Sequence, residues 1–315
     1  MIRVLSWQRS GVAWVPWRMA QACAMAPCRA VEVELWAPNP QNLECYGLPC
    51  PVRGAVSLPS VAAQLSGPSP SPDWILLHHS YVAQRSGDLE AARSVFPAAR
   101  VAVMIHGEPD REQLEGGHSH RSPREADLYI AVSSDLVPLL QRHRERVPVA
   151  LLPNHPVREI EPGRPYPDRP RSMYVPFSHV AAKKDHPALR RIEPEIQRDG
   201  WEVVWETRRR SNDEVLAALG EHRMVWVQLQ GYAPDILTQE AWARCCIPIV
   251  TADSQASVRW RYPFGFASAA SEDLIHDIRE RDREGVDMVT LGLAAAAERS
   301  ATQYAEEIAV VFSAA

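Results

Sequence analysis

Two patterns of apolar and polar residues alternate along the whole chain. Short apolar runs bounded by turn residues are typical of buried strands, and apolar residues at three- and four-residue spacing are typical of helices. Strands that alternate with helices predict parallel sheets with crossover helices, so the expected fold class is α/β. The predicted strands are Arg3–Ser6, Val31–Leu35, Trp74–Leu77, Val101–Ile105, Leu128–Val132, Ala150–Leu152, Met173–Val175, Glu202–Trp205, Val225–Val227 and Pro248–Val250.

Helical spacing appears between these strands and again after the last of them. A long, Ala-rich amphipathic helix is expected near the end of the chain, from about Met288 to Phe312. The other predicted helices are Pro16–Met25, Leu89–Phe96, Asp135–His143, Leu189–Arg198, Asn212–Leu219, Leu237–Arg244 and Glu272–Arg281.

A proline-rich segment divides the chain. Six prolines fall between Pro153 and Pro170, without apolar periodicity, so no regular element is expected there. The alternation of strands and helices resumes beyond it. The predicted division is a first domain over residues 1–155, a linker over 156–170, a second domain over 171–290, and a C-terminal helix over 291–315 that packs across the two domains.

Length and composition agree with this division. A chain of 315 residues, with 46% hydrophobic and 23% charged residues, is expected to form about two soluble domains. The net charge of −5 argues against a surface coated with basic residues for non-specific nucleic-acid binding, although it leaves local basic patches open. No segment resembles a signal peptide, and no apolar run reaches the ~18 residues of a membrane span. We therefore expect a cytoplasmic protein without stable membrane insertion.

Cysteines and histidines provide no recognisable metal site. The pairs Cys23/Cys28 and Cys45/Cys50 are too loosely spaced for a zinc knuckle, and the adjacent Cys245 and Cys246 lie in a predicted core, so free thiols are expected. The pairs His78/His79 and His118/His120 lack a neighbouring carboxylate or cysteine at ligand spacing, and we interpret them as loop and strand-end residues.

The segment Asp235–Thr251 is the strongest candidate for a binding site. It joins a polar turn, a short helix that carries Glu240, and a buried strand. Ligands of open α/β sheets collect at the carboxyl ends of the strands, and a helix N-terminus offers unpaired N–H groups to an anion. The segment therefore predicts a phosphate-bearing ligand.

This segment also resembles the donor-binding motif of retaining, family-four glycosyltransferases of the GT-B fold. Other matches to the family follow in the same order along the chain, among them a glycine loop, a strand that ends in histidine, and a strand of the form A-D-x-x-I-A-V-S. The matching positions are Glu240, Ala241, Ala243, Cys245, Pro248, Ile249 and Val250 in the motif, and Ser10–Ala13, Ile105–Pro109, Arg124–Ser133, Leu151–Asn154 and Ser178–Asp185 elsewhere.

The resemblance implies two Rossmann-like domains that face each other across a cleft. The first would be the acceptor-side domain and the second the nucleotide-sugar-binding domain. In the first, Gly11 would let the backbone approach the donor phosphates, and His106 would contact the transferred sugar.

In the second domain, the resemblance implies that Glu240 accepts hydrogen bonds from the ribose hydroxyls. The family clamps the diphosphate with an arginine and a lysine, which fall at His179 and Lys184, with Lys183 beside them. A histidine lacks the guanidinium fork, so this position departs from the family pattern.

The family's sugar-facing glutamate is also replaced, because Tyr232 stands at its position. Asp235 is the candidate substitute, and the backbone N–H groups of Ile236 and Leu237 would face the sugar or the phosphate. Arg208, which follows a predicted strand, could lie near the phosphate or the base.

The resemblance predicts a retaining, metal-independent glycosyltransferase without a cofactor, which takes a nucleotide-diphosphate sugar, with a UDP-sugar favoured, to a hydroxyl acceptor. A glycan, a small molecule, a protein and a hydroxymethylated base in DNA stay open as acceptors. Nucleic acid stays among them because Arg208–Arg210 and Trp260–Tyr262 combine basic and aromatic residues. No protein partner is indicated. Two alternatives also stay open: a non-catalytic nucleotide-sugar-binding protein, and a nucleotide-sugar epimerase or hydrolase of the same fold.

Overall fold

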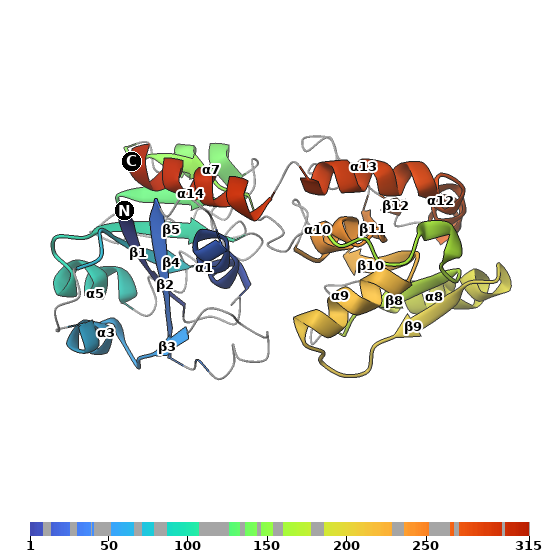
Figure 1. The fold of residues 1–315 in the computed structure, drawn as a ribbon, viewed down its shortest axis with the longest axis horizontal. Coiled ribbons are helices and arrows are strands. Elements are labelled where there is room, and N and C mark those ends of the chain that lie inside the picture. Colours follow the sequence, from blue (N-terminus) through green and yellow to red (C-terminus); the bar gives the residue numbers. More distant parts are fainter. Residues whose placement is uncertain are drawn as a thin grey trace. The chain divides into compact units, whose positions relative to one another are not determined.

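The computed structural model describes residues 1–8, 14–25, 30–38, 40, 52–65, 71–78, 87–106, 126–132, 136–143, 146–153, 160–177, 186–228, 236–251, 265–267, 271–297 and 300–314. The chain forms two compact units (Figure 1). Unit 1 contains Met1–Val157 and Ala301–Ala315, and unit 2 contains Arg158–Ser300.

Unit 1 is built on a seven-stranded sheet in which every strand pair is parallel. The strand order is β3-β2-β1-β4-β5-β6-β7, so the direction of winding reverses between β1 and β4. The helices α1 and α14 pack against each other, and α3 packs against α5. The strands are β1 (Ile2–Trp7), β2 (Val31–Ala37), β3 (Val52–Gly54), β4 (Trp74–His78), β5 (Arg100–Ile105), β6 (Leu128–Ala131) and β7 (Val149–Leu151), and the helices are α1 (Trp14–Met25), α3 (Leu58–Leu65), α5 (Asp88–Val95), α7 (Leu136–His143) and α14 (Ala301–Ala314).

Unit 2 is built on a five-stranded parallel sheet with the order β12-β11-β10-β8-β9, whose winding reverses between β8 and β10. Two hydrophobic clusters are formed on this sheet. One contains side chains of α8 and α12, and the other contains side chains of α9 and α10. The elements are the 3-10 helix η1 (Tyr166–Asp168), β8 (Ser172–Val175), α8 (His186–Arg198), β9 (Glu202–Trp205), α9 (Asn212–Glu221), β10 (Met224–Gln228), α10 (Ile236–Ala243), β11 (Ile247–Thr251), β12 (Gly265–Ala267), α12 (Ser271–Arg283) and α13 (Gly285–Ala297).

Every strand predicted from the sequence is present, and its ends lie within one or two residues of the predicted ends. The α/β fold class is confirmed. The sequence pattern missed β3, β12, α3 and the 3-10 helix η1. The three residues of β3 are all at least partly exposed, and α3 buries only Leu58 and Val61.

The single helix expected over Met288–Phe312 is wrong, because two helices occupy this stretch. Helix α13 belongs to unit 2, where it packs against α10 and η1, whereas α14 belongs to unit 1. Both helices are apolar on one side. Helical periodicity therefore continues from one to the other and does not reveal that their apolar sides are buried in different cores.

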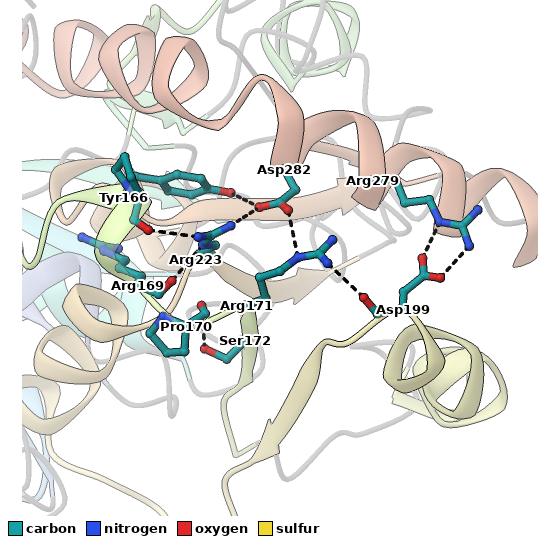
Figure 2. Close-up of polar contacts among 10 residues, drawn as sticks. Tyr166, Arg169, Pro170, Arg171, Ser172, Asp199, Arg223, Arg279 and Asp282 are labelled. Atoms are coloured by element: carbon teal, nitrogen blue, oxygen red, sulfur yellow. Dashed lines mark hydrogen bonds and ion pairs between the residues drawn. The ribbon is translucent and has the colours of Figure 1, made fainter.

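The proline-rich linker also differs from expectation, since residues 160–170 belong to unit 2 and contain η1. Tyr166 is buried, and its hydroxyl donates to Oδ1 of Asp282 over 3.2 Å. Arg223 donates to the same carboxylate oxygen over 2.8 Å and to the Arg169 carbonyl over 3.0 Å (Figure 2). Side-chain hydrogen bonds of this kind hold a segment that lacks the backbone hydrogen bonds of a long regular element, and apolar periodicity cannot detect them.

Candidate functional site

In unit 1, polar side chains gather at the carboxyl ends of the three adjacent strands β1, β4 and β5. Ser6 lies near the end of β1, His78 is the last residue of β4, and His106 directly follows β5. The strand order reverses between β1 and β4, and such a reversal is where open α/β sheets bind ligands.

These three side chains form a continuous hydrogen-bonded series. Ser6 Oγ lies 2.8 Å from Nε2 of His78, and Nδ1 of His78 lies 2.8 Å from Nε2 of His106. Ser6 and His78 are buried, with 0% and 3% exposure, whereas His106 is partly exposed. The series therefore runs from the interior of the sheet to its edge.

In unit 2, Glu240 lies beside the reversal between β8 and β10. It is carried by α10, which follows β10, and only 5% of it is exposed. Asn212, the first residue of α9, donates from Nδ2 to Oε1 of Glu240 over 3.1 Å. Helix α9 follows β9, so helices from both sides of β8 meet at this carboxylate.

The amino end of α9 is fixed by a capping box. The Ser211 hydroxyl accepts from the backbone N–H of Glu214, and the Glu214 carboxylate accepts from the backbone N–H of Ser211. Arg208 donates to the same carboxylate over 2.7 Å. These donors, the Ser211 backbone first and Arg208 second, hold the pKa of Glu214 below its ordinary value. The cap fixes where α9 begins, and therefore fixes Asn212.

Five of the residues selected from the sequence lie outside the described part of the chain: Gly11, His179, Lys183, Lys184 and Asp235.

The other five selected residues are described. Ile236 and Leu237 begin α10, so their backbone N–H groups are among those that a helix N-terminus leaves without intrahelical partners. Arg208 is exposed and bound to Glu214, His106 belongs to the series with Ser6 and His78, and Glu240 accepts from Asn212.

Sequence reasoning missed Asn212 and Ser6 as site residues, and it assigned His78 to a strand end without a function. These residues can be recognised only once the strand order is known, because their partners are distant in sequence. Asn212 and Glu240 are 28 residues apart, and Ser6 and His78 are 72 residues apart. A linear pattern does not give strand order.

Among the described residues, no cluster of three or more His, Cys, Asp or Glu side chains is suited to hold a metal ion. In the same part of the chain, no helix has the length and apolar character to cross a membrane. The described cysteines Cys23, Cys245 and Cys246 are buried free thiols, as expected.

Comparison with known proteins gives a clear result for structures and none for sequences. No family model matches the chain, and no curated protein matches it. HepE from Anabaena, solved with UDP-glucose, is similar with a TM-score of 0.67, at 12% identity and over 100% of both chains. A glycosyltransferase from Rickettsia africae is similar with a TM-score of 0.63, at 9% identity and over 98% of both chains.

The N-terminal domain of a trehalose-6-phosphate phosphatase from Candida albicans is also similar, with a TM-score of 0.60 and 9% identity over 99% of this chain and 97% of that one. Identities this low establish the fold alone. With its two Rossmann-like α/β units, the chain has the GT-B fold expected from the sequence.

Proposed function

We propose that this protein is a glycosyltransferase that takes its sugar from a nucleotide-diphosphate donor, with a UDP-sugar favoured. The observation that carries the proposal is the buried carboxylate of Glu240 at the strand-order reversal of unit 2, held by Asn212. A carboxylate accepts two hydrogen bonds at once, which suits the neighbouring hydroxyls of a ribose. The likeness to HepE, solved with UDP-glucose, supports the same ligand class.

The remaining donor contacts follow from the family resemblance. The N–H groups of Ile236 and Leu237 at the start of α10 would bind sugar or phosphate oxygens. The diphosphate charge would be balanced by basic side chains without a metal ion. Gly11, His179, Lys183, Lys184 and Arg208 are the proposed donor-binding residues that complete this set.

In the transfer step, the bond between the anomeric carbon and the donor phosphate oxygen breaks, and a bond to the acceptor oxygen forms. The nucleoside diphosphate leaves, and its departing phosphate oxygen takes the proton that the acceptor hydroxyl loses. We propose that His106 and Asp235 contact the transferred sugar, and that the sugar keeps its anomeric configuration. No cofactor enters this step.

Donor binding is tested by isothermal titration with UDP-, GDP-, ADP-, CDP- and TDP-sugars. Glu240→Gln keeps the shape of the side chain and removes its charge. Because a hydrogen bond to a charged group contributes about 1.5–3 kcal/mol, we expect the affinity for the preferred donor to fall about 10- to 100-fold. Glu202→Gln is the matched control, since Glu202 is exposed at the opposite end of β9. Equal affinities of the two variants would refute the role of Glu240.

Turnover separates this proposal from its two alternatives. A transferase releases nucleoside diphosphate faster when a suitable hydroxyl acceptor is added, whereas a hydrolase or epimerase consumes the donor without one. A binding protein binds the donor and releases nothing. The acceptor panel includes glycans, small alcohols and hydroxymethylated DNA, and the NMR coupling constant of the product's anomeric proton reports whether the configuration is retained.

A further inference from the structure

The series Ser6, His78 and His106 follows a diagonal across three strands of unit 1. Ser6 is paired with Leu76, two residues before His78, and His78 is paired with Met104, two residues before His106. Side chains alternate between the faces of a sheet, so all three lie on the same face. Each step along the series also moves two residues closer to the carboxyl edge.

Diagonal neighbours on a sheet face are farther apart than direct neighbours, and long side chains can span the gap. Here two hydrogen bonds of 2.8 Å do so. The rings of His78 and His106 are nearly parallel, with an angle of 24° between their planes and 5.1 Å between their centroids. The His106 ring is therefore held in one orientation by a buried neighbour.

The hydrogen bond between the two histidines also links the positions of their ring protons. In this bond one nitrogen donates and the other accepts, so the bond links the tautomer of His106 to that of His78. Nε2 of His106 is therefore the nitrogen whose hydrogen-bonding role depends on His78.

We propose that His78, itself held by Ser6, is a positioning residue that fixes the ring orientation and the tautomer of His106. The consequence for catalysis rests on the proposed function, in which His106 contacts the transferred sugar. The positioning itself does not depend on that function and is tested separately.

The first test is nitrogen NMR of the intact protein with 15N-labelled histidine, in which His106→Gln assigns the His106 signals. The wild type is expected to show a single His106 tautomer, and His78→Phe is expected to show the averaged signals of an unconstrained ring. His78→Asn should shift the His106 signals less than His78→Phe does, because the asparagine amide can still hydrogen-bond Nε2 of His106. Unchanged His106 signals in folded His78→Phe would overturn the proposal.

The control for packing is Leu76→Val, because Leu76 is buried two residues before His78 on the same face and is paired with Ser6. We expect the His106 signals of this variant to match the wild type. Ser6→Ala removes one link with little change in volume, and it provides a folded variant if His78→Phe is unstable. In Ser6→Ala we expect a partial loss of the single tautomer, and signals identical to the wild type would overturn the role of Ser6.

The second test is kinetic. Small misplacements of a catalytic group can cost about 100-fold in rate, so we expect His78→Phe to lower kcat at least about tenfold. The KM for the sugar donor should change less than about twofold, and His78→Asn should restore most of kcat. In a His106→Ala background, His78→Phe should have no further effect. An unchanged kcat in His78→Phe would overturn the catalytic consequence, whereas a protein that transfers no sugar would contradict the proposed function and leave the NMR result to decide the positioning.

Discussion

Arg169 is a buried cation whose partners are backbone carbonyls. Its guanidinium donates to carbonyls at the carboxyl ends of α9 and α10, where helices leave C=O groups without intrahelical partners. Burial lowers the pKa of Arg169 from its ordinary value. The five acceptors, at 2.6 to 3.1 Å, are the carbonyls of Arg164, Leu219, His222, Arg244 and Cys245.

Removing this side chain should strongly destabilise unit 2. Arg169→Leu leaves several carbonyls unpaired in a buried place, at about 1–3 kcal/mol each, so we expect a loss of at least about 3 kcal/mol in the free energy of unfolding. Urea denaturation measures it. The control Arg164→Leu removes an exposed arginine side chain paired with Glu221, and its effect should stay below about 1 kcal/mol. Comparable losses in both variants would contradict this role for Arg169.

Cys245 has a backbone angle φ of +56°, which side-chain-bearing residues rarely adopt. It ends the turn after α10, where its N–H donates to the Trp242 carbonyl. Glycine adopts this conformation without the steric cost of about 1–2 kcal/mol that a Cβ atom brings. We therefore expect Cys245→Gly to be more stable than Cys245→Ala by about 1 kcal/mol, measured by thermal unfolding. Both variants lose the buried sulfur, and an alanine variant of equal or higher stability would show that the backbone is unstrained.

The two principal candidate residues, Glu240 and His106, could be selected from the sequence because each lies in a recognisable local motif. Asn212 and His78 could not, since nothing in their own segments indicates a site. Their importance comes from a hydrogen bond to a residue on another element. Such pairs depend on strand order, which the hydrophobic pattern leaves undetermined.

At the scale of elements, strands such as β4, β6 and β8 were predictable because they are buried on both faces, and all five residues of β4 are buried. Their apolar runs are set by burial and need no knowledge of partners. The proline-rich segment and the C-terminal helices were predicted wrongly because their burial depends on their tertiary partners. Tyr166 and Phe312 are both buried, but in different units, and only tertiary packing decides which unit buries each.

The end of α9 should make unit 2 sensitive to mild acid. His222 caps this helix, lies 2.7 Å through Nδ1 from the Ser172 hydroxyl, and is parallel to the Tyr174 ring. Burial lowers the pKa of His222 from its ordinary value. The unfolded chain then binds a proton at a higher pH than the folded chain, so this contribution to stability is full above about pH 6.5 and is lost as the pH falls below it.

Urea unfolding of the wild type and His222→Gln between pH 7.5 and 5.5 measures this effect. The wild type should lose stability more steeply below about pH 6.5, with a difference in slope of up to about 1.4 kcal/mol per pH unit. Subtracting the stability of His222→Gln from that of the wild type at each pH removes contributions shared by both proteins, such as those of other histidines. Parallel curves would mean that His222 takes up its proton equally well in both states.

At the scale of the whole molecule, the chain returns to unit 1 after it has completed unit 2. Helix α14 buries Tyr304, Ile308 and Phe312, and the Phe312 ring meets the edge of Trp74 in β4 at 5.4 Å between centroids. Residues that follow unit 2 in sequence therefore stabilise unit 1 (Figure 1).

Phe312→Ala tests whether the two units are energetically separate. Loss of a buried phenylalanine costs about 3–5 kcal/mol, and this cost should lower the unfolding transition of unit 1 alone in calorimetry, because each unit has its own core. The affinity for the sugar donor, which we assign to unit 2, should stay within about twofold. Val310→Ala is the control on the same helix, since Val310 is 65% exposed and its replacement should change stability by less than about 0.5 kcal/mol. If Phe312→Ala lowers a single transition common to the whole chain, the two cores unfold together and α14 couples them.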